Sequence, residues 1–321
     1  MVAGTLLRIA SRGSQLALWQ AHAVERALLA ADPDAEVRID VVKTIGDKIL
    51  DVPLAKIGDK GLFTKELDEA LLSGAADLAV HSLKDVPTRL PDGLVIAAIT
   101  VREDPRDVLI LAPGRTGSLT TLPAGARVGT SSLRRRAQLQ ARRPDLEVLD
   151  LRGNLNTRLA KLDRGEYEGI ILAAAGVLRL GWDDRISEHL DPSAWLPAVG
   201  QGALAVVARA DDEPLLQRLR GLDHAPTAAA TTAERAFLRA LEGGCQVPIG
   251  ALGELHDGRL TLHGLVASTS GDTILRASID GAPEDAATLG RGLADELLRR
   301  GAGELLAEIR REVPAARPEQ P

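Results

Sequence analysis

The sequence has one cysteine, few aromatic side chains and no long apolar segment. The single cysteine, Cys245, excludes an internal disulfide and agrees with a reducing compartment. Aromatic residues make up only 2% of the chain, which argues against stacking platforms for single-stranded nucleic acid. No apolar run reaches the roughly 18 residues that span a bilayer, and Arg8 and Arg12 interrupt the N-terminal segment where a secretory signal would lie. We therefore expect a cytoplasmic protein that does not enter a membrane.

Cofactor and metal motifs are missing as well. The six histidines are dispersed and there is one cysteine, so no metal-ligand cluster is predicted. Neither a Walker sequence nor a GxGxxG turn occurs, which gives no support for a nucleoside triphosphate or a dinucleotide. The 321 residues, 45% hydrophobic and 26% charged, match an average soluble protein. At about 150 residues per domain, this length predicts two domains or three small ones.

Basic residues are concentrated in one segment of an acidic chain. The net charge is −6, but nine basic and three acidic residues between Arg127 and Lys161 give that segment +6, which leaves −12 for the remainder. Of the 39 basic residues, seven are lysines and 32 are arginines. A compositional bias would explain the arginines, but guanidinium groups also bind carboxylates or phosphates bidentately. The pattern favours a small, highly charged anion over nucleic acid.

Strand and helix patterns alternate through the first two thirds of the chain. This alternation predicts an α/β fold with parallel sheets covered on both faces. A run at 203–208 predicts a buried strand that returns between two such units. The other expected strands lie at about 7–9, 37–41, 78–80, 94–99, 108–111, up to 129, near 148 and at 170–173, and the helices at 14–28, 64–72 and 132–141.

The pattern changes after Pro226. A helix at about 228–241 precedes three alternating runs, separated by turn signals at Asp257-Gly258 and Gly271-Asp272. Two helices then finish the pattern, which predicts a small α+β domain with an antiparallel sheet. The runs lie at 251–256, 259–268 and 273–280, and the helices at about 283–300 and 303–312.

Three strand-to-helix turns carry arginine and hydroxyl side chains. They are the segments 11–14, 129–136 and 152–158. Backbone N–H groups at a helix N-terminus favour an anion, whereas arginines in the first turn oppose the helix dipole and need another reason to be there. A capped helix with a solvated basic first turn is the alternative at 129–136, and a simple helix cap is the alternative at 11–14. If the turns face one cleft at the carboxyl ends of strands, they indicate a ligand with several acidic groups.

Three other segments carry reactive side chains. In the segment 81–87, Asp85 is a candidate general acid or base and Lys84 a candidate anion contact, although a solvated surface pair is the alternative. The segment 56–65 predicts either a mobile lid or an ordinary connection. Cys245 follows two glycines and is either an inert core residue or an exposed nucleophile or covalent anchor.

Seven motifs in order resemble the porphobilinogen deaminase, or hydroxymethylbilane synthase, family. The resemblance implies two α/β domains like those of periplasmic binding proteins, with a central cleft, and a small C-terminal α+β domain with a three-stranded antiparallel sheet. We expect these domains at 1–102 with 200–222, at 103–199 and at 223–321. The motifs are RIASRGSQLALWQ, KIGDKGLFTKEL, HSLKDVP, GTSSLRRRAQL, LRGNLNTRLAKL, LPAVGQGALAV and EGGCQVPIGA.

The resemblance also implies an activity and a cofactor. Such enzymes join four porphobilinogen molecules head to tail, release ammonia at each step, and hydrolyse off hydroxymethylbilane in tetrapyrrole (haem) biosynthesis. Cys245 would carry a dipyrromethane cofactor through a thioether, and Asp85 matches the catalytic aspartate. The implied cofactor contacts are Ser82, Lys84, Thr130, Ser132, Arg134, Arg135 and Arg158, and the implied substrate contacts are Arg12, Ser14, Lys56, Lys60, Phe63, Arg152 and Gln201.

Charge supports this interpretation separately from the motifs. Each pyrrole ring brings two carboxylates, and like charges 4 Å apart near a protein surface repel by up to about 4 kcal/mol, so an arginine-lined cleft is required. The main rival is a non-catalytic binding module for a polycarboxylate or phosphate, which needs neither a group on Cys245 nor a role for Asp85. A nucleic-acid binder is disfavoured by the net charge. We expect a monomer.

Overall fold

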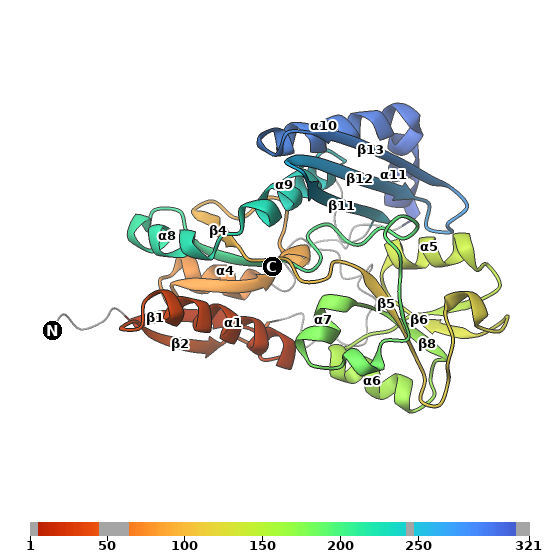
Figure 1. Ribbon diagram of the computed structural model, residues 1–321, viewed down its shortest axis with the longest axis horizontal. Helices are drawn as coiled ribbons and strands as arrows, with labels where there is room; N and C mark the ends of the chain where they lie inside the picture. Colours follow the sequence, from red (N-terminus) through yellow and green to blue (C-terminus); the bar gives the residue numbers. More distant parts are fainter. Residues whose placement is uncertain (1–5, 45–63, 242–246, 313–321) are drawn as a thin grey trace, which may run out of the picture. The chain divides into compact units, whose positions relative to one another are not determined.

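The computed structural model describes residues 6–44, 64–241 and 247–312, and the chain forms two compact units (Figure 1). The described part of the first unit is 6–44, 64–103 and 202–228. The second unit contains 104–201, 229–241 and 247–312.

A five-stranded mixed sheet forms the first unit. The strand order is β2-β1-β3-β10-β4, in which β1 runs parallel to β2 and β3, whereas β10 runs antiparallel to β3 and β4. The expectation of a wholly parallel sheet was therefore wrong. The run at 203–208 is a buried strand as expected, but it enters the sheet in the opposite direction. The strands are β1 (Leu6–Ser11), β2 (Glu36–Val41), β3 (Leu78–Ser82), β4 (Leu94–Ile99) and β10 (Leu204–Arg209).

Helices cover both faces of this sheet, as predicted. Ile9 packs with α1 (Gln15–Ala31) and α8 (Glu213–Leu219) on one face, whereas its neighbour Ala10 packs with α4 (Lys65–Leu72) on the other, because successive strand residues point to opposite faces. Ser14 caps α1 as predicted, its Oγ accepting from the Ala17 N–H at 3.2 Å. Thr64 precedes α4 but makes no capping hydrogen bond through its side chain.

The second unit contains another five-stranded mixed sheet. The strand order is β7-β6-β8-β5-β9, with β6 parallel to β7 and β8, and β5 antiparallel to β8 and β9. Helix α5 (Leu133–Arg142) packs on one face, and α6 (Leu155–Asp163) with α7 (Ala174–Arg179) on the other. The strands are β5 (Asp107–Leu111), β6 (Arg127–Gly129), β7 (Glu147–Leu149), β8 (Gly169–Ala173) and β9 (Glu188–His189).

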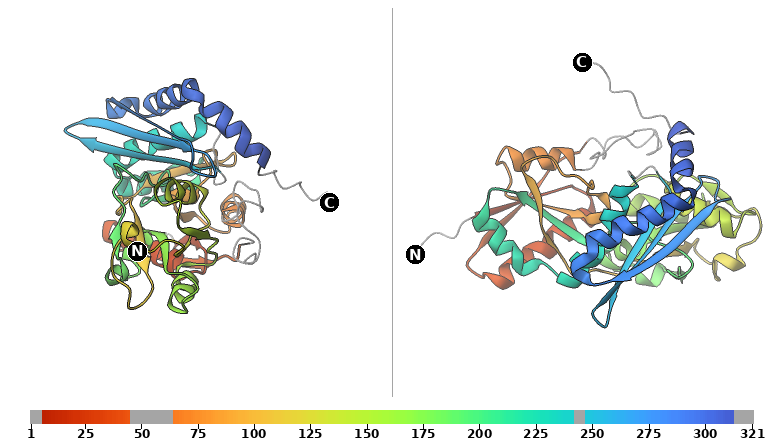
Figure 2. Two further views of the ribbon diagram at one scale, coloured as in Figure 1. Left: turned by 90° about the vertical axis from the view of Figure 1, so that its right-hand side faces the viewer. Right: turned by 90° about the horizontal axis from the view of Figure 1, so that it is seen from above.

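A three-stranded antiparallel sheet lies in the C-terminal part of the second unit, as predicted. Its hairpin turn has positive φ at Asp257 (48°) and Gly258 (76°), which suits a two-residue connection. Helix α10 lies along one face of the sheet (Figure 2) and shares a core there with α9 and α11. The opposite face packs against Ala137 of α5 and Leu196. The elements are α9 (Ala225–Ala240), β11 (Ile249–His256), β12 (Arg259–Ala267), β13 (Ile274–Gly281), α10 (Ala286–Leu297) and α11 (Gly303–Glu312).

Candidate active site

Two neighbouring strands of the first sheet end at the same edge. Strands β1 and β3 are adjacent and parallel, so the residues that follow them share this edge. Helix α1 is tied to the end of β3, because Gln20 Nε2 donates to Ser82 Oγ at 2.8 Å. Five residues singled out from the sequence lie at or directly after these strand ends: Arg12, Ser14, Ser82, Lys84 and Asp85.

Asp85 is the exposed member of this group. It ends a short 3-10 turn, Leu83–Asp85, in which Leu83 is buried and Lys84 is half-buried. The turn is anchored in the sheet, since the Leu83 N–H donates to the Ala203 carbonyl at 2.9 Å. The buried Leu83 therefore fixes the backbone of the turn, while Asp85 is exposed.

His81, in β3, is buried beside this turn. Burial, and to a smaller extent the positive charge of Arg12, lower the pKa of His81 to about 4. The imidazole is therefore neutral at pH 7. The Arg12 guanidinium, which follows β1, thus lies near enough to His81 in β3 to lower its pKa further.

The second sheet has a comparable edge where β6 and β7 end. Ser132 caps α5 through its Oγ, which accepts from the Arg135 N–H at 3.4 Å. The Ser132 N–H in turn donates to Thr130 Oγ1 at 3.2 Å. Both hydroxyl residues thus shape the N-terminal turn of the helix, and Thr130 is buried.

After β7, the chain forms a second capped turn. Asn154 Oδ1 accepts from the Thr157 N–H at 2.9 Å, and Arg158 Nε donates to the Gly153 carbonyl at 2.8 Å. Arg152 and Arg158 are half-buried. Because β6 and β7 are adjacent and parallel, this turn and the turn at Ser132 share one edge of the sheet.

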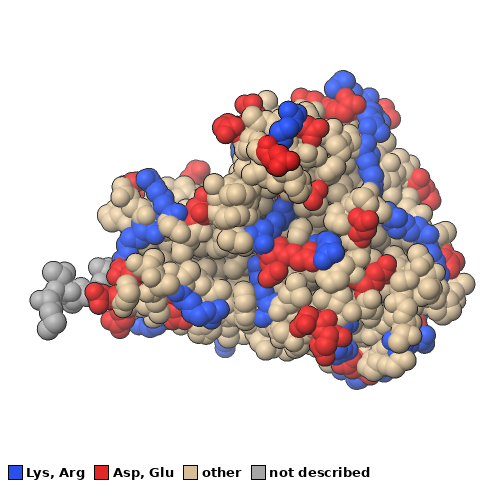
Figure 3. Space-filling model, viewed as in Figure 1, with Lys and Arg blue, Asp and Glu red and all other residues tan. Residues whose placement is uncertain are grey.

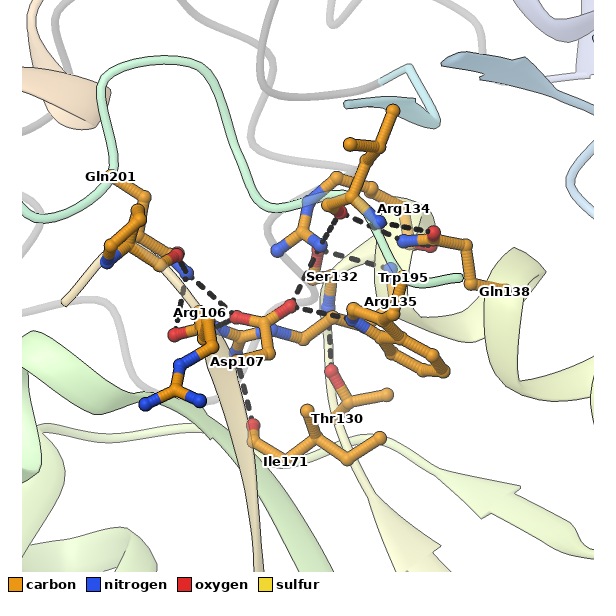
Figure 4. Close-up of polar contacts among 12 residues, drawn as sticks. Arg106, Asp107, Thr130, Ser132, Arg134, Arg135, Gln138, Ile171, Trp195 and Gln201 are labelled. Carbon is orange, nitrogen blue, oxygen red and sulfur yellow. Dashed lines mark hydrogen bonds and ion pairs between the residues drawn. The ribbon is translucent and has the colours of Figure 1, made fainter. Parts of the chain in front are cut away.

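The arginines at the start of α5 are directed to different places. Arg134 and Arg135 are buried, at 4% and 6% exposure, and both bind Asp107 (Figure 4). Arg136 points the other way and pairs with Asp150 at 3.1 Å. The alternative of a solvated basic first turn is therefore wrong for Arg134 and Arg135. Their ion pairs with the buried Asp107 carboxylate explain why arginines occupy this end of the helix although the helix dipole disfavours them there.

Asp107 was missed in the sequence, although it organises this cluster. It is fully buried and accepts hydrogen bonds from Arg134, Arg135, Trp195 Nε1 and Gln201 Nε2. Gln201, which was predicted to contact substrate, is only 1% exposed, and its side-chain amide donates to Asp107. The sequence contained one signal for this cluster, because Asp107 directly precedes the apolar run 108–111. An aspartate beside a buried apolar run needs a buried hydrogen-bond partner.

Several predicted residues lie outside the described part of the chain: Lys56, Lys60, Phe63 and Cys245. Within the described ranges, no group of three His, Cys, Asp or Glu side chains could hold a metal ion. No described helix is long and apolar enough to cross a membrane. On the face drawn in Figure 3, acidic and basic side chains are interspersed.

Residues of this site fit an acidic organic group. Arg135 Nε is buried without a hydrogen-bond partner among the described residues, and a buried N–H donor of this kind is costly unless an acceptor reaches it. The surrounding donors are guanidinium, hydroxyl and backbone N–H groups, which bind carboxylates. A dipyrromethane, with two carboxylates on each ring, has the chemistry that this donor set binds.

Comparison with known proteins gives the chain a family. Residues 7–217 match the family model described as porphobilinogen deaminase, dipyromethane cofactor binding domain. Residues 228–299 match the model of the porphobilinogen deaminase C-terminal domain. Among solved structures, a BvgS periplasmic VFT2 domain of Bordetella pertussis is 15% identical with a TM-score of 0.40 over 68% of this chain and 86% of its own, a likeness too distant to carry an argument.

Curated relatives extend this match over nearly the whole chain. Porphobilinogen deaminase of Moorella thermoacetica is 56% identical over 304 residues, which are 95% of this chain and 96% of that protein. The enzymes of Syntrophobacter fumaroxidans and Synechococcus elongatus are 53% and 54% identical, over 95% and 94% of this chain and 98% and 95% of their own. At this identity and coverage, the chain belongs to the porphobilinogen deaminase family.

Proposed function

We propose that this chain condenses four porphobilinogen molecules head to tail on a dipyrromethane primer, releases ammonia at each step, and hydrolyses the product to hydroxymethylbilane. The observation that carries the proposal is the 56% identity to a porphobilinogen deaminase across 95% of the chain. We further propose a monomeric cytoplasmic enzyme that takes no metal and binds neither nucleic acid nor membrane. Its domains would be 1–102 with 200–222, 103–199 and 223–321.

Cofactor binding would use basic and hydroxyl side chains. The dipyrromethane supplies the pyrrole carbon at which chain growth starts, and a thioether to Cys245 keeps it attached because a thioether is not a leaving group here. Guanidinium and ammonium groups would neutralise its carboxylates, and hydroxyl groups would complete the hydrogen bonds. The residues proposed for this task are Ser82, Lys84, Thr130, Ser132, Arg134, Arg135 and Arg158.

Substrate binding would use the turns that follow β1 and β7. Arg12 and Ser14 stand at the N-terminus of α1, where the helix dipole also favours an acetate or propionate group. Arg152 occupies the corresponding place before α6. The proposed set also contains residues outside the described ranges, and in full it is Arg12, Ser14, Lys56, Lys60, Phe63, Arg152 and Gln201.

Asp85 would act on the reacting pyrrole. As ammonia leaves porphobilinogen, positive charge develops and spreads toward the ring nitrogen. A carboxylate that accepts the pyrrole N–H stabilises this charge most where it is greatest, in the transition state. The exposed Asp85 carboxylate can take this role and assist proton transfer, because the buried Leu83 holds the turn that carries it.

Intact mass spectrometry tests the proposed cofactor. The purified protein should exceed the 33.9 kDa polypeptide by two linked pyrrole units. Cys245→Ala should lack this added mass and be inactive, whereas an exposed substitution such as Asp92→Asn should retain both mass and activity. An unmodified, fully active wild type would refute the covalent primer. Tight binding of polycarboxylates by an unmodified, inactive wild type would instead favour the binding-module alternative.

A further inference from the structure

The Asp107 carboxylate is held by four buried N–H donors, two on each oxygen (Figure 4). Oδ2 accepts from Arg134 Nη1 at 2.7 Å and from Trp195 Nε1 at 2.8 Å. Oδ1 accepts from Arg135 Nη2 at 2.7 Å and from Gln201 Nε2 at 2.8 Å. Burial by itself would raise the pKa of Asp107, but the two guanidinium charges hold it far below its usual range. The carboxylate is therefore ionised at any physiological pH.

Both arginines are fixed at a second point as well. Arg134 Nη1 also donates to the Leu196 carbonyl at 2.7 Å, and Arg135 Nη1 donates to the Ile171 carbonyl at 2.9 Å. Two anchors on a planar guanidinium leave it little freedom to rotate. The directions of the remaining N–H groups, including the buried Arg135 Nε, are consequently set by Asp107 and these carbonyls.

We propose that Asp107 is a positioning residue, which holds the guanidinium groups of Arg134 and Arg135 in the orientation that binds the carboxylates of the cofactor and growing chain. This inference rests on the proposed function. Asp107 has no exposed surface, so it can act only through the groups that bind it, among which the two arginines carry the charge that a carboxylate ligand needs. By orienting the arginines, Asp107 would favour binding of an acidic ligand. Its own negative charge, by contrast, would disfavour that ligand.

Because orientation and charge act in opposite directions, the direction of the change in KM on substitution of Asp107 tests the proposal. Asp107, Arg134 and Arg135 together carry a net charge of +1, and Asp107→Asn raises it to +2. If charge alone mattered, an acidic substrate would bind the variant more tightly and KM would fall. If orientation matters, the released arginines bind less well and KM rises.

The experiment compares Asp107→Asn with Asp77→Asn in the full-length protein. Asp77 is a suitable control, because its carboxylate also pairs with two arginines, Arg8 at 2.9 Å and Arg209 at 3.6 Å, at the start of β3 and away from the strand ends of the site. For each protein, the cofactor occupancy is measured by intact mass, kcat and KM by ammonia release, and Tm by calorimetry.

Asp107→Asn should lower cofactor occupancy and reduce kcat/KM by about 100-fold, mainly through KM, as a displaced binding group does. Asp77→Asn should lower Tm and leave occupancy and KM unchanged. A lower KM for Asp107→Asn, or an unchanged KM and occupancy with only a loss of Tm, would overturn the proposal.

Trp195→Phe keeps the test valid if Asp107→Asn does not fold. It removes one donor to Oδ2 without changing any charge, and KM should rise by several-fold, to about tenfold at most; an unchanged KM would count against the proposal. A wild type without cofactor mass and activity would mean that the proposed function itself had failed. If the wild type has the cofactor mass and activity, and the Asp107 and Trp195 variants have the same KM and occupancy as the wild type, only the positioning role is rejected.

Discussion

Ser131 is joined to Leu151 by a reciprocal pair of hydrogen bonds. The Ser131 Oγ donates to the Leu151 carbonyl at 2.9 Å and accepts from the Leu151 N–H at 3.0 Å. One hydroxyl group thereby fastens the turn after β6 to the turn after β7. The donors at the start of α5 and those at the start of α6 are held in one relative position, which a ligand with several carboxylates needs.

The second of these turns depends on Gly153. Its φ is +109°, and an added Cβ would lie 2.6 Å and 2.7 Å from Thr157 side-chain atoms. Gly153→Ala should destabilise the fold by more than the roughly 1–2 kcal/mol of a left-handed alanine, and should raise KM because Arg152 and Arg158 flank the turn. Urea unfolding and steady-state kinetics measure the two effects.

Gly165→Ala is the matched control for that variant. Its φ of +76° imposes a similar backbone strain, but no atom lies within 4 Å of the added Cβ. We expect a loss of roughly 1–2 kcal/mol, from the left-handed backbone alone, and an unchanged KM. Equal effects of the two variants would show that the contact with Thr157 has no importance.

Asp85→Asn should abolish nearly all turnover and leave the fold intact. The side chain is exposed, so the isosteric amide removes no buried contact. It cannot supply the negative charge that stabilises the developing cation, and loss of such a group typically costs a factor of about 100 to 1,000 in kcat. Single-turnover ammonia release and Tm are the measurements. A variant with the wild-type rate would remove Asp85 from the mechanism.

Arg158→Gln should raise KM for porphobilinogen or lower cofactor occupancy. A charge-assisted hydrogen bond contributes about 1.5–3 kcal/mol, so an effect of about tenfold or more is expected. Arg164, at the other end of α6, is exposed and pairs with Glu166 at 2.6 Å. Arg164→Gln should therefore behave as wild type, and similar losses in both variants would point to a general charge effect.

His81 should make the protein less stable as the pH falls from about 6.5 to 4. Its pKa is lowered to about 4 by burial, whereas an unfolded histidine titrates near 6.5. In this window the unfolded chain binds the additional proton, so the free energy of unfolding falls by up to about 3 kcal/mol as the pH decreases. Urea unfolding from pH 4 to 7.5 measures the slope.

Substitution of His81 checks the origin of that slope. His81→Gln should flatten the dependence on pH, while substitution of the exposed His22 should leave it unchanged. If the slope of His81→Gln equals that of wild type, then another group accounts for the loss of stability in acid.

Much of the fold follows from signals that act over a few residues. Ser14, Ser132 and Asn154 cap the helices that follow them, as hydroxyl and amide side chains do wherever a helix begins. The turn at Asp257-Gly258 specifies the hairpin of the third sheet because both residues tolerate positive φ. The motifs also placed the chain in its family.

Strand direction was decided only by the tertiary structure. The sequence predicted β5 as a strand and β10 as a buried strand, but not that each runs antiparallel to its neighbours. Because β5 is antiparallel to β8, its first residue, Asp107, lies opposite Ala173 at the carboxyl end of β8. This pairing brings the carboxylate to the edge where α5 begins, 27 and 28 residues along the chain from its arginine partners.

The amino-acid sequence by itself determined many of the helices, strands and turns, and which side chains could bind carboxylates, since caps, periodicity and charge are local properties. The tertiary structure alone decided that Arg134 and Arg135 are buried against Asp107 while Arg136 is directed outward. The physical reason is that burial and ion pairing depend on strand order and direction, which bring together residues that no local pattern relates.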